Sequence, residues 1–502
     1  MDSAMPSLSR REFLRVAGHG GLGAVALSLG GASLLERSSA AQSARAAARE
    51  IRLEAREVTW ELAPGKVIKG LAYNGQIPGP ELRLKEGERV RIVVTNALAE
   101  PTTIHWHGVD VPNPMDGVPG VTQQPVEPGG TFVYEFDARP AGTRWYHTHF
   151  QEHRQMDLGL AAPLIIEPAR SEPFSVDREI TLVLDDWATG TGRALPPTAE
   201  GIAGGRGSMG GMMGMMGGGM MGGGGMGGMM RGRHTPAYDT MTINGKAYPA
   251  TTPLRVRRGE RLRLRFINAS ADHTHVIRLA GHRLHVSHTD GNPLVHPVEV
   301  DAVPIAPGER YDVLVVADRP GAWFLLCAQP GHAAAGEQMV VVYDGQASTQ
   351  SDPPMADLSG LELWRYGLGR GRPVLPVPTG TTRVFELGLS GGMMGSDVWT
   401  INDQRYPDTE PLRVRRGDRV RVAFSNMSME GHPMHLHGQS FTVVAVNGAR
   451  SAEPLVKDVV DVAPHMGSAV IEFTAQSPGD WFFHCHKPMH MDGGMITLVK
   501  IA

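Results

Sequence analysis

Cysteine, basic charge and long apolar runs are all scarce in this 502-residue chain. Its two cysteines, Cys327 and Cys485, exclude a disulfide scaffold, so each thiol has to be interpreted from its own neighbours. The formal net charge of −4 provides no basic face for nucleic acid. The one long apolar stretch, residues 16–35, is rich in glycine and too weakly hydrophobic for a stable membrane-spanning helix. We therefore expect no nucleic-acid partner and no stable membrane insertion.

That apolar stretch belongs to an N-terminal segment with the features of an export signal. Ser9-Arg10-Arg11-Glu12-Phe13-Leu14 resembles a twin-arginine motif, and small residues at 38–48 follow the apolar stretch, where cleavage would fall. We expect residues 1–48 to be a twin-arginine signal peptide that delivers the protein to the periplasm, the cell envelope or the extracellular space. The alternative is an ordinary N-terminal helix.

The rest of the chain contains an internal repeat. Residues 241–270 match residues 399–428 at a constant offset of 158, and residues 73–96 carry a third copy. Each copy alternates apolar and polar residues, turns at Gly-Glu or Gly-Asp, and then alternates again, which is typical of β-strands. Convincing long amphipathic helices are absent. The sequence therefore predicts an all-β protein of three β-sandwich domains, at about 50–168, 178–345 and 360–502.

Four His-x-His pairs mark the first and third domains. They are His105/His107, His147/His149, His435/His437 and His484/His486. Residues two apart on a strand point to the same face, so each pair presents two imidazoles together. Eight histidines that meet across an interface could hold a compact set of copper ions, because imidazole suits copper well. Lone histidines are common, but four pairs at equivalent places in two repeats favour a metal site.

Cys485 lies between the two histidines of the fourth pair, so it points to the opposite face of its strand. His432, His490 and Met495 are its expected partners there. A cysteine, two histidines and a weak axial methionine make a blue-copper site. The covalent bonds from Cys485 to its neighbours would connect that copper to the cluster. The alternative, a buried apolar thiol, leaves the flanking histidines unexplained.

These motifs resemble the four copper motifs of the multicopper oxidase family, over nearly the whole mature chain. The resemblance implies three consecutive cupredoxin-like Greek-key domains and four copper ions. It implies a type 1 copper on His432, Cys485, His490 and axial Met495, a type 2 copper on His105 and His435, and a type 3 pair on His107, His147, His149, His437, His484 and His486. It also implies an enzyme that takes single electrons at the type 1 copper and reduces O2 to water at the other three.

The resemblance extends to the supply of protons, with one departure. Asp116, eleven residues beyond His105, matches the acid of the family that helps to deliver protons to the cluster. Many bacterial members also place a glutamate directly after the second type 1 histidine. This chain has Met491 there, with Asp492 next, so the proton route is left open.

Within the family, the chain most resembles bacterial cuprous oxidases and copper-resistance oxidases, through its twin-arginine motif, its methionine-rich segment and its methionine axial ligand. The expected function is oxidation of Cu(I) coupled to reduction of O2, in copper tolerance, by a monomer. One alternative is a laccase-like oxidase that takes electrons from phenols or aromatic amines, small organic reductants. Another is a copper-binding or divisome-type scaffold without catalysis.

The methionine-rich segment is a glycine-rich insertion at 201–232, with ten methionines between Met209 and Met230. Thioethers select Cu(I), and glycine at this density cannot build a core. We therefore expect the segment to capture metal, with a flexible linker as the alternative. The expected inner end of the same route is formed by Met393, Met394, Met427, Met429 and Glu430.

The second domain keeps only part of a blue-copper pattern. The offset of 158 places Cys327 on Cys485, His332 on His490, Thr274 on His432 and Glu337 on Met495. Threonine is not the specific first histidine of a type 1 site, and glutamate is not a soft axial ligand. We therefore expect a decayed ancestral site. The alternative is a working mononuclear site that uses His273 or His275.

Overall fold

The computed structural model describes residues 48–190, 236–345, 360–364, 366 and 383–502. The expected signal peptide, the methionine-rich segment and most of the proline-rich stretch near 353–378 lie outside these residues. Nearly all regular structure in the described part is β-strand. No helix there is long and apolar enough to cross a membrane.

The first sandwich consists of two four-stranded sheets, ordered β2-β1-β4-β6 and β3-β8-β7-β5. Its elements are β1 (Arg49–Ala63), β2 (Lys66–Tyr73), β3 (Leu82–Lys85), β4 (Arg89–Asn96), β5 (His105–His107), η1 (Asn113–Met115), β6 (Thr131–Asp137), β7 (Gly142–His147), α2 (Glu152–Gln155) and β8 (Ala161–Glu167). The alternation in β4 buries Val90, Ile92 and Val94 between the sheets. β1 pairs in parallel with β4, so the chain crosses over between them as in a Greek key.

The second sandwich has a six-stranded sheet, β10-β9-β12-β17-β14-β15, and a five-stranded sheet, β11-β19-β18-β13-β16. Its strands are β9 (Arg178–Trp187), β10 (Thr240–Ile243), β11 (Leu254–Val256), β12 (Arg261–Asn268), β13 (His275–Leu279), β14 (Leu284–Thr289), β15 (Asn292–Val300), β16 (Val303–Ile305), β17 (Arg310–Val316), β18 (Ala322–Cys327) and β19 (Gln338–Tyr343).

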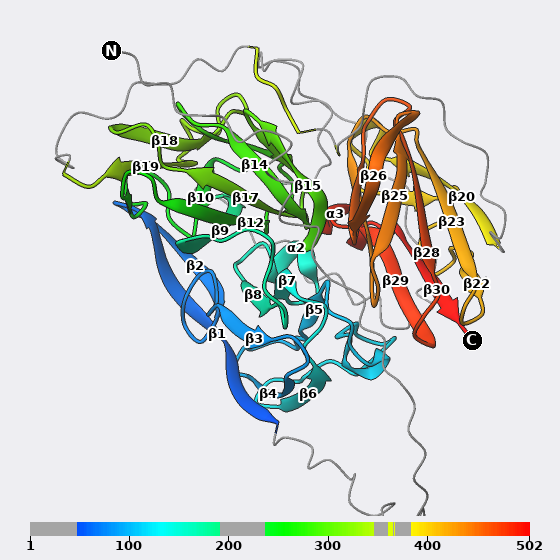
Figure 1. Ribbon diagram of the computed structural model, residues 1–502. Coiled ribbons are helices and arrows are strands. Elements are labelled where there is room, and N and C mark those ends of the chain that lie inside the picture. Colours follow the sequence, from blue (N-terminus) through cyan, green and yellow to red (C-terminus); the bar gives the residue numbers. More distant parts are fainter. Residues whose placement is uncertain (1–47, 191–235, 346–359, 365, 367–382) are drawn as a thin grey trace, which may run out of the picture. The chain divides into compact units, whose positions relative to one another are not determined.

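The third sandwich repeats the second strand for strand, as β21-β20-β23-β28-β25-β26 and β22-β30-β29-β24-β27 (Figure 1). Its elements are β20 (Arg383–Gly391), η3 (Met393–Gly395), β21 (Trp399–Ile401), β22 (Leu412–Val414), β23 (Arg419–Asn426), β24 (His432–Leu436), β25 (Phe441–Val446), β26 (Ala449–Lys457), β27 (Val459–Val462), β28 (Ser468–Thr474), β29 (Gly479–Cys485), α3 (Pro488–Asp492) and β30 (Ile496–Ile501). The repeat seen in the sequence is therefore a repeat of sheet order.

The turn shared by the three copies shows why they fold alike. Gly87, Gly259 and Gly417 join β3 to β4, β11 to β12 and β22 to β23, at φ values of 82°, 82° and 88°. Residues with a Cβ rarely adopt this left-handed backbone, and glycine does so without strain. The alternating runs on either side of the turn then enter the two opposite sheets of one sandwich.

Candidate metal centre

The predicted blue-copper residues converge inside the third sandwich. β24 pairs antiparallel with β29, with Met434 opposite Cys485, and this register brings His432 to the cysteine sulfur. His432 Nδ1 lies 3.6 Å from Cys485 Sγ, His490 Nδ1 lies 3.5 Å from it, and the two nitrogens are 3.1 Å apart. Met495 is fully buried, and its carbonyl accepts a hydrogen bond from the Cys485 amide at 3.1 Å. One sulfur and two imidazole nitrogens therefore surround a single point, as trigonal copper requires.

The far nitrogens of both imidazoles are held from outside, which orients the near ones. Ser428 Oγ lies 2.8 Å from His432 Nε2, and His490 Nε2 donates to Glu430 Oε2 at 3.2 Å. The ring of Trp399 stacks on that of His490 at 3.7 Å. Outer contacts of this kind determine which nitrogen is free to bind a metal.

The other eight predicted histidines form three groups, each of which combines histidines of the first and third sandwiches. The groups are His105/His107/His435, His107/His147/His486 and His149/His437/His484. β5 pairs with β7 and β24 with β29, which sets His105 opposite His147 and His435 opposite His484. Across the first and third sandwiches, His105 Nε2 lies 3.4 Å from His435 Nε2. The last two groups have the composition expected for a type 3 pair, and the first contains both expected type 2 histidines.

Most of these histidines donate one ring nitrogen to a protein oxygen and leave the other turned inward. His105 donates to the carbonyl of Asp116, and His435 to the carbonyl of Asp458, both at 2.8 Å. His147 and His484 donate to nearby carbonyls in the same way. The inward atoms His107 Nδ1, His147 Nε2 and His149 Nε2, and both nitrogens of His486, are buried without a hydrogen-bond partner. Buried polar atoms are normally paired, so this arrangement fits a site built for metal ions.

Burial favours the neutral form of seven of these imidazoles, which is the form that binds metal. Desolvation is the largest cause, and neighbouring groups, mostly imidazoles, add to it. Together they lower the pKa well below 6.5 for His107, His147, His149, His435, His437 and His486. The same burial lowers the pKa of His484 to about 4.

Asp116 and Glu152 each place a buried carboxyl group against the cluster. Asp116 Oδ2 accepts a hydrogen bond from His437 Nδ1 at 2.8 Å, and its Oδ1 lies 3.3 Å from His105 Nδ1. Glu152, at the start of α2, places Oε1 3.3 Å from His149 Nε2. Burial, with Asp492 adding to it, raises the pKa of the Glu152 carboxyl well above its usual range. Asp116 was predicted from the sequence and Glu152 was not, because the only signal for Glu152 is its position three residues beyond His149.

Asp492, the other acid considered, lies in α3 and contacts α2. Its carboxylate accepts hydrogen bonds from the ring and the backbone amide of His153. His153 directly follows Glu152 in α2. Asp492 therefore binds the short helix that carries the Glu152 carboxyl group to the cluster.

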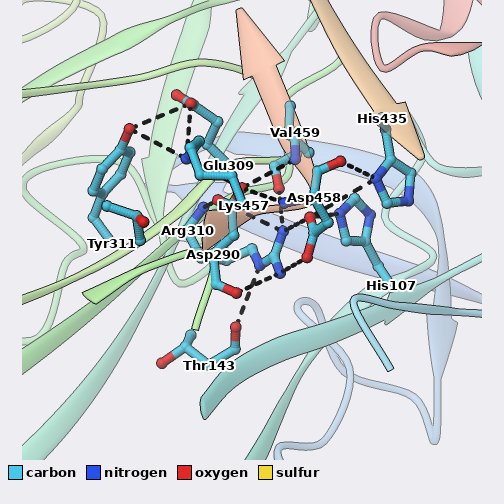
Figure 2. Close-up of polar contacts among 12 residues, drawn as sticks. His107, Thr143, Asp290, Glu309, Arg310, Tyr311, His435, Lys457, Asp458 and Val459 are labelled. Atoms are coloured by element: carbon cyan, nitrogen blue, oxygen red, sulfur yellow. Dashed lines mark hydrogen bonds and ion pairs between the residues drawn. The ribbon is translucent and has the colours of Figure 1, made fainter. Parts of the chain in front are cut away.

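A buried ionic network connects the cluster to the second sandwich (Figure 2). Asp458 Oδ1 accepts from His107 Nε2 at 3.0 Å, and both carboxylate oxygens accept from Arg310, at 2.5 and 2.6 Å. Lys457 lies 3.1 Å from both Asp290 and Glu309. Asp458 therefore orients two of the clustered histidines, His107 through its carboxylate and His435 through its carbonyl, and is itself fixed by an arginine of the second sandwich. No motif or spacing in the sequence indicates this network.

The three cupredoxin-like sandwiches hold two kinds of candidate copper site. One combines a cysteine with two histidines, and the other consists of eight clustered histidines. This is the arrangement of an oxygen-using copper oxidase. Family models for multicopper oxidases match residues 54–171, 220–346 and 379–502. The chain is 34% identical to multicopper oxidase MmcO of Mycobacterium tuberculosis over 86% of its length and 83% of the relative. It belongs to the multicopper oxidase family.

Two further comparisons agree with this membership. Copper resistance protein A of Escherichia coli is 28% identical and aligns over 87% of this chain and 90% of its own. The crystal structure of a multi-copper oxidase from Pseudomonas thermotolerans superposes with a TM-score of 0.67 and 26% identity, over 91% of this chain and 99% of that one. The predicted all-β fold of three cupredoxin-like domains is confirmed, and the chain is an oxidase rather than a non-catalytic scaffold. The assignment of individual ligands and the domain limits stay predictions.

Proposed function

We propose that this protein oxidises Cu(I) to Cu(II) and reduces O2 to water, as part of copper tolerance. Four Cu(I), one O2 and four protons give four Cu(II) and two water molecules. His432, Cys485, His490 and Met495 would hold a type 1 copper, and the eight clustered histidines would hold a type 2 copper and a type 3 pair. These four resident coppers would supply one-electron transfer and O2 reduction.

The proposal that Cu(I) is the electron donor rests on the surface next to His490. Glu430, which accepts the hydrogen bond from His490 Nε2, has a side chain that is 32% exposed. The four exposed methionines of the described residues are Met393, Met427, Met429 and Met466. Met427 and Met429 flank Ser428, and the Met466 amide donates to the carbonyl of Asn426 at 2.9 Å. Soft thioethers and a carboxylate next to a type 1 ligand favour a soft metal ion as the electron donor.

The chain itself joins the two kinds of site. Cys485 and its neighbours His484 and His486 are consecutive in sequence, with the sulfur on one face and the imidazoles on the other. The distance between donor site and O2 site is therefore spanned by a few covalent bonds. Relatives named for copper resistance support the same physiological role.

Protons must reach the buried cluster, and the chain offers two carboxyl groups for this purpose. Asp116 bridges His105 and His437, and Glu152 approaches His149. A carboxyl group within hydrogen-bond reach can hold or move a proton where O2 is reduced. We propose that both serve the reaction, with Asp116 as the principal donor.

Export through the twin-arginine route to the periplasm or cell envelope is part of the proposal, because copper tolerance of this type acts outside the cytoplasm. The support for this export route is the twin-arginine motif at Ser9–Leu14. Replacement of Arg10 and Arg11 by lysine should keep the protein in the cytoplasm, as measured by cell fractionation.

The test compares O2 consumption with Cu(I) and with a phenol for wild type, Met427→Leu and Met429→Leu. Loss of a thioether should lower kcat/KM for Cu(I) and leave the phenol rate near wild type, because the type 1 ligands and the groups that hold their outer nitrogens are untouched. Met393→Leu, on η3, extends the same comparison to another exposed thioether. Equal loss for both substrates, or no loss, would contradict Cu(I) as the donor and favour a laccase-like oxidase of phenols.

A further inference from the structure

The second sandwich contains a set of metal-binding side chains that the multicopper cluster does not use. His275, Cys327, His332 and Glu337 are all buried, and one donor atom from each lies within 4.8 Å of the others. None of these residues belongs to the copper sites described above. The set lies at the end of β13 and β18, where the third sandwich has its blue-copper residues.

The strand register corrects the expected match between the two sites. Ile277 pairs with Cys327, as Met434 pairs with Cys485. Two residues before Ile277 is His275, just as His432 is two residues before Met434. The expectation that Thr274 occupies this place is therefore wrong.

The cause is one additional residue in the preceding loop. Five positions separate Ser270 from His275, and four separate Ser428 from His432. Both serines nevertheless contact the Nε2 atom of their histidine, at 2.6 and 2.8 Å. An alignment at a constant offset of 158 does not account for this inserted residue, so it matches Thr274 with His432 by mistake.

The backbone around the other two positions is also shared. The Cys327 amide donates to Glu337 O, and the Cys485 amide to Met495 O, both at 3.1 Å. The Glu337 amide donates to His332 O at 3.0 Å, and the Met495 amide to His490 O at the same distance. Every ligand position of the blue-copper site therefore has a metal-binding side chain here, with a carboxylate in place of the thioether.

The donor atoms are spaced as a four-coordinate ion requires. Cys327 Sγ lies 3.3 Å from His332 Nδ1, and Glu337 Oε2 lies 3.3 Å from His332 Nδ1 and 2.7 Å from His275 Nδ1. Tetrahedral zinc, with bonds of about 2.0–2.3 Å, separates its ligands by about 3.3–3.6 Å. The closest contact needs to open by about 0.6 Å on this estimate. Glu337 Oε1 is buried without a hydrogen-bond partner.

We propose that the second sandwich binds a fifth metal, a divalent zinc-like ion held by Cys327, His275, His332 and Glu337. A thiolate and a carboxylate together balance the charge of a divalent ion, and a carboxylate is a hard ligand that disfavours Cu(I). The Val276 amide donates to Cys327 Sγ at 3.2 Å, whereas Pro433, at the equivalent place, has no N–H. This extra donor would stabilise the thiolate that a bound divalent ion requires.

The ion is structural and takes no part in electron transfer. Leu326 and Ala328 flank Cys327, where histidines flank Cys485. No imidazole pair therefore continues from this sulfur to an O2 site. A closed four-ligand site is typical of structural zinc, which leaves no open position for a substrate.

His273, the other histidine that the sequence left open, is occupied elsewhere. Its Nδ1 donates to Asp186 Oδ2 at 2.8 Å, and its ring lies edge-on to that of His332. It therefore provides a matched control for His275, two residues away in the same segment.

The test uses the copper-loaded protein, incubated with Zn(II), freed of loose metal by dialysis, and analysed for zinc and copper per chain. Wild type and His273→Gln should retain one equivalent of zinc, whereas His275→Gln and Glu337→Gln should lose it with copper unchanged. Co(II) in place of zinc should give a thiolate charge-transfer band that Cys327→Ser removes. Cys485→Ser should keep both the zinc and this band, which separates the inference from the proposed oxidase function.

Two outcomes would overturn the proposal. One is wild-type protein that retains neither Zn(II) nor Co(II), or that retains them equally in His275→Gln and Glu337→Gln. The other is a fifth copper with its own blue band, lost in Cys327→Ser, which would show a redox-active site and contradict a structural divalent ion. Because zinc retention is measured on folded, copper-containing protein, a variant that fails to fold is recognised by its missing copper.

Discussion

Replacing Asp458 by asparagine tests how the second sandwich supports the copper cluster. The carboxylate accepts three hydrogen bonds, two from Arg310 and one from His107. An amide of the same shape has one acceptor oxygen, and its NH2 group would face one of those donors. Removing one partner of a buried ion pair costs about 3–5 kcal/mol, a large share of the roughly 5–15 kcal/mol by which most domains are stable. His107 would lose its outer acceptor, and His435 would be held by a displaced carbonyl.

Contacts that orient metal ligands typically change metal affinity by about 10–100-fold. We therefore expect Asp458→Asn to lose type 2 and type 3 copper and O2 reduction, and to keep the blue type 1 band. Metal analysis, visible absorption and electron paramagnetic resonance measure the three together. Asp312→Asn is the matched control, because Asp312 is equally buried and paired with Arg265 at 2.7 Å, but contacts no copper-site histidine. If Asp458→Asn keeps four coppers at wild-type affinity, or if Asp312→Asn loses as much copper, the positioning role is refuted.

Further tests concern the two copper sites, the methionine-rich segment and the copper-free protein. Cys485→Ser should abolish the blue band and turnover with the cluster mostly filled, and a surviving blue band would show that another thiolate binds the type 1 copper. Asp116→Asn should slow turnover by about 10²–10⁴-fold at unchanged copper content, as measured by O2 uptake, and a larger loss in Glu152→Gln would transfer the principal role to that residue. Deletion of Met209–Met230 should weaken Cu(I) oxidation at low copper and keep or raise activity on bulky phenols, whereas a parallel fall in both rates would make the segment a linker. The copper-free protein should lose stability on acidification, because its cluster histidines have lowered pKa values and the unfolded chain binds more protons below about pH 6.5. Each such histidine should lower the free energy of unfolding by about 1.4 kcal/mol for every pH unit between about pH 6.5 and its pKa in the folded protein. A free energy of unfolding that stays constant from about pH 7 to pH 5 would contradict this prediction.

The grouping of the candidate copper ligands could be predicted from the sequence because their geometry is local. In a His-x-His pair on a strand, the period of two directs both imidazoles to one face and the residue between them to the other. His484, Cys485 and His486 therefore predicted two sites from three consecutive residues. The internal repeat predicted three sandwiches for a similar reason, since each of its three copies contains a complete strand–turn–strand unit.

The residues that support the cluster could not be predicted in this way. Arg310 and Asp458 are 148 positions apart, and His107 and Asp458 are 351 apart. No spacing rule connects them, because the contact depends on how separate sandwiches pack. Each is an ordinary charged residue in the sequence, and only burial reveals that it must have a partner.

The misassigned histidine of the second sandwich has a different cause. A constant offset assumes that no residue is inserted within a repeat, and the loop before His275 contains one more residue than the loop before His432. Backbone pairing with Cys327 and Cys485 determines the true match. The correction changes the interpretation of the site from a remnant to a complete set of four donors.

The stoichiometry of the reaction shows whether Cu(I) oxidation is coupled to complete reduction of O2. A solution of copper-loaded protein would be supplied with Cu(I) under limiting O2, with O2 uptake, Cu(II) formation and hydrogen peroxide measured together. Four Cu(II) should form for each O2 consumed, with no peroxide, and Cys485→Ser should show no turnover. Two Cu(II) per O2 with an equivalent of peroxide, or the same rate in Cys485→Ser, would contradict it.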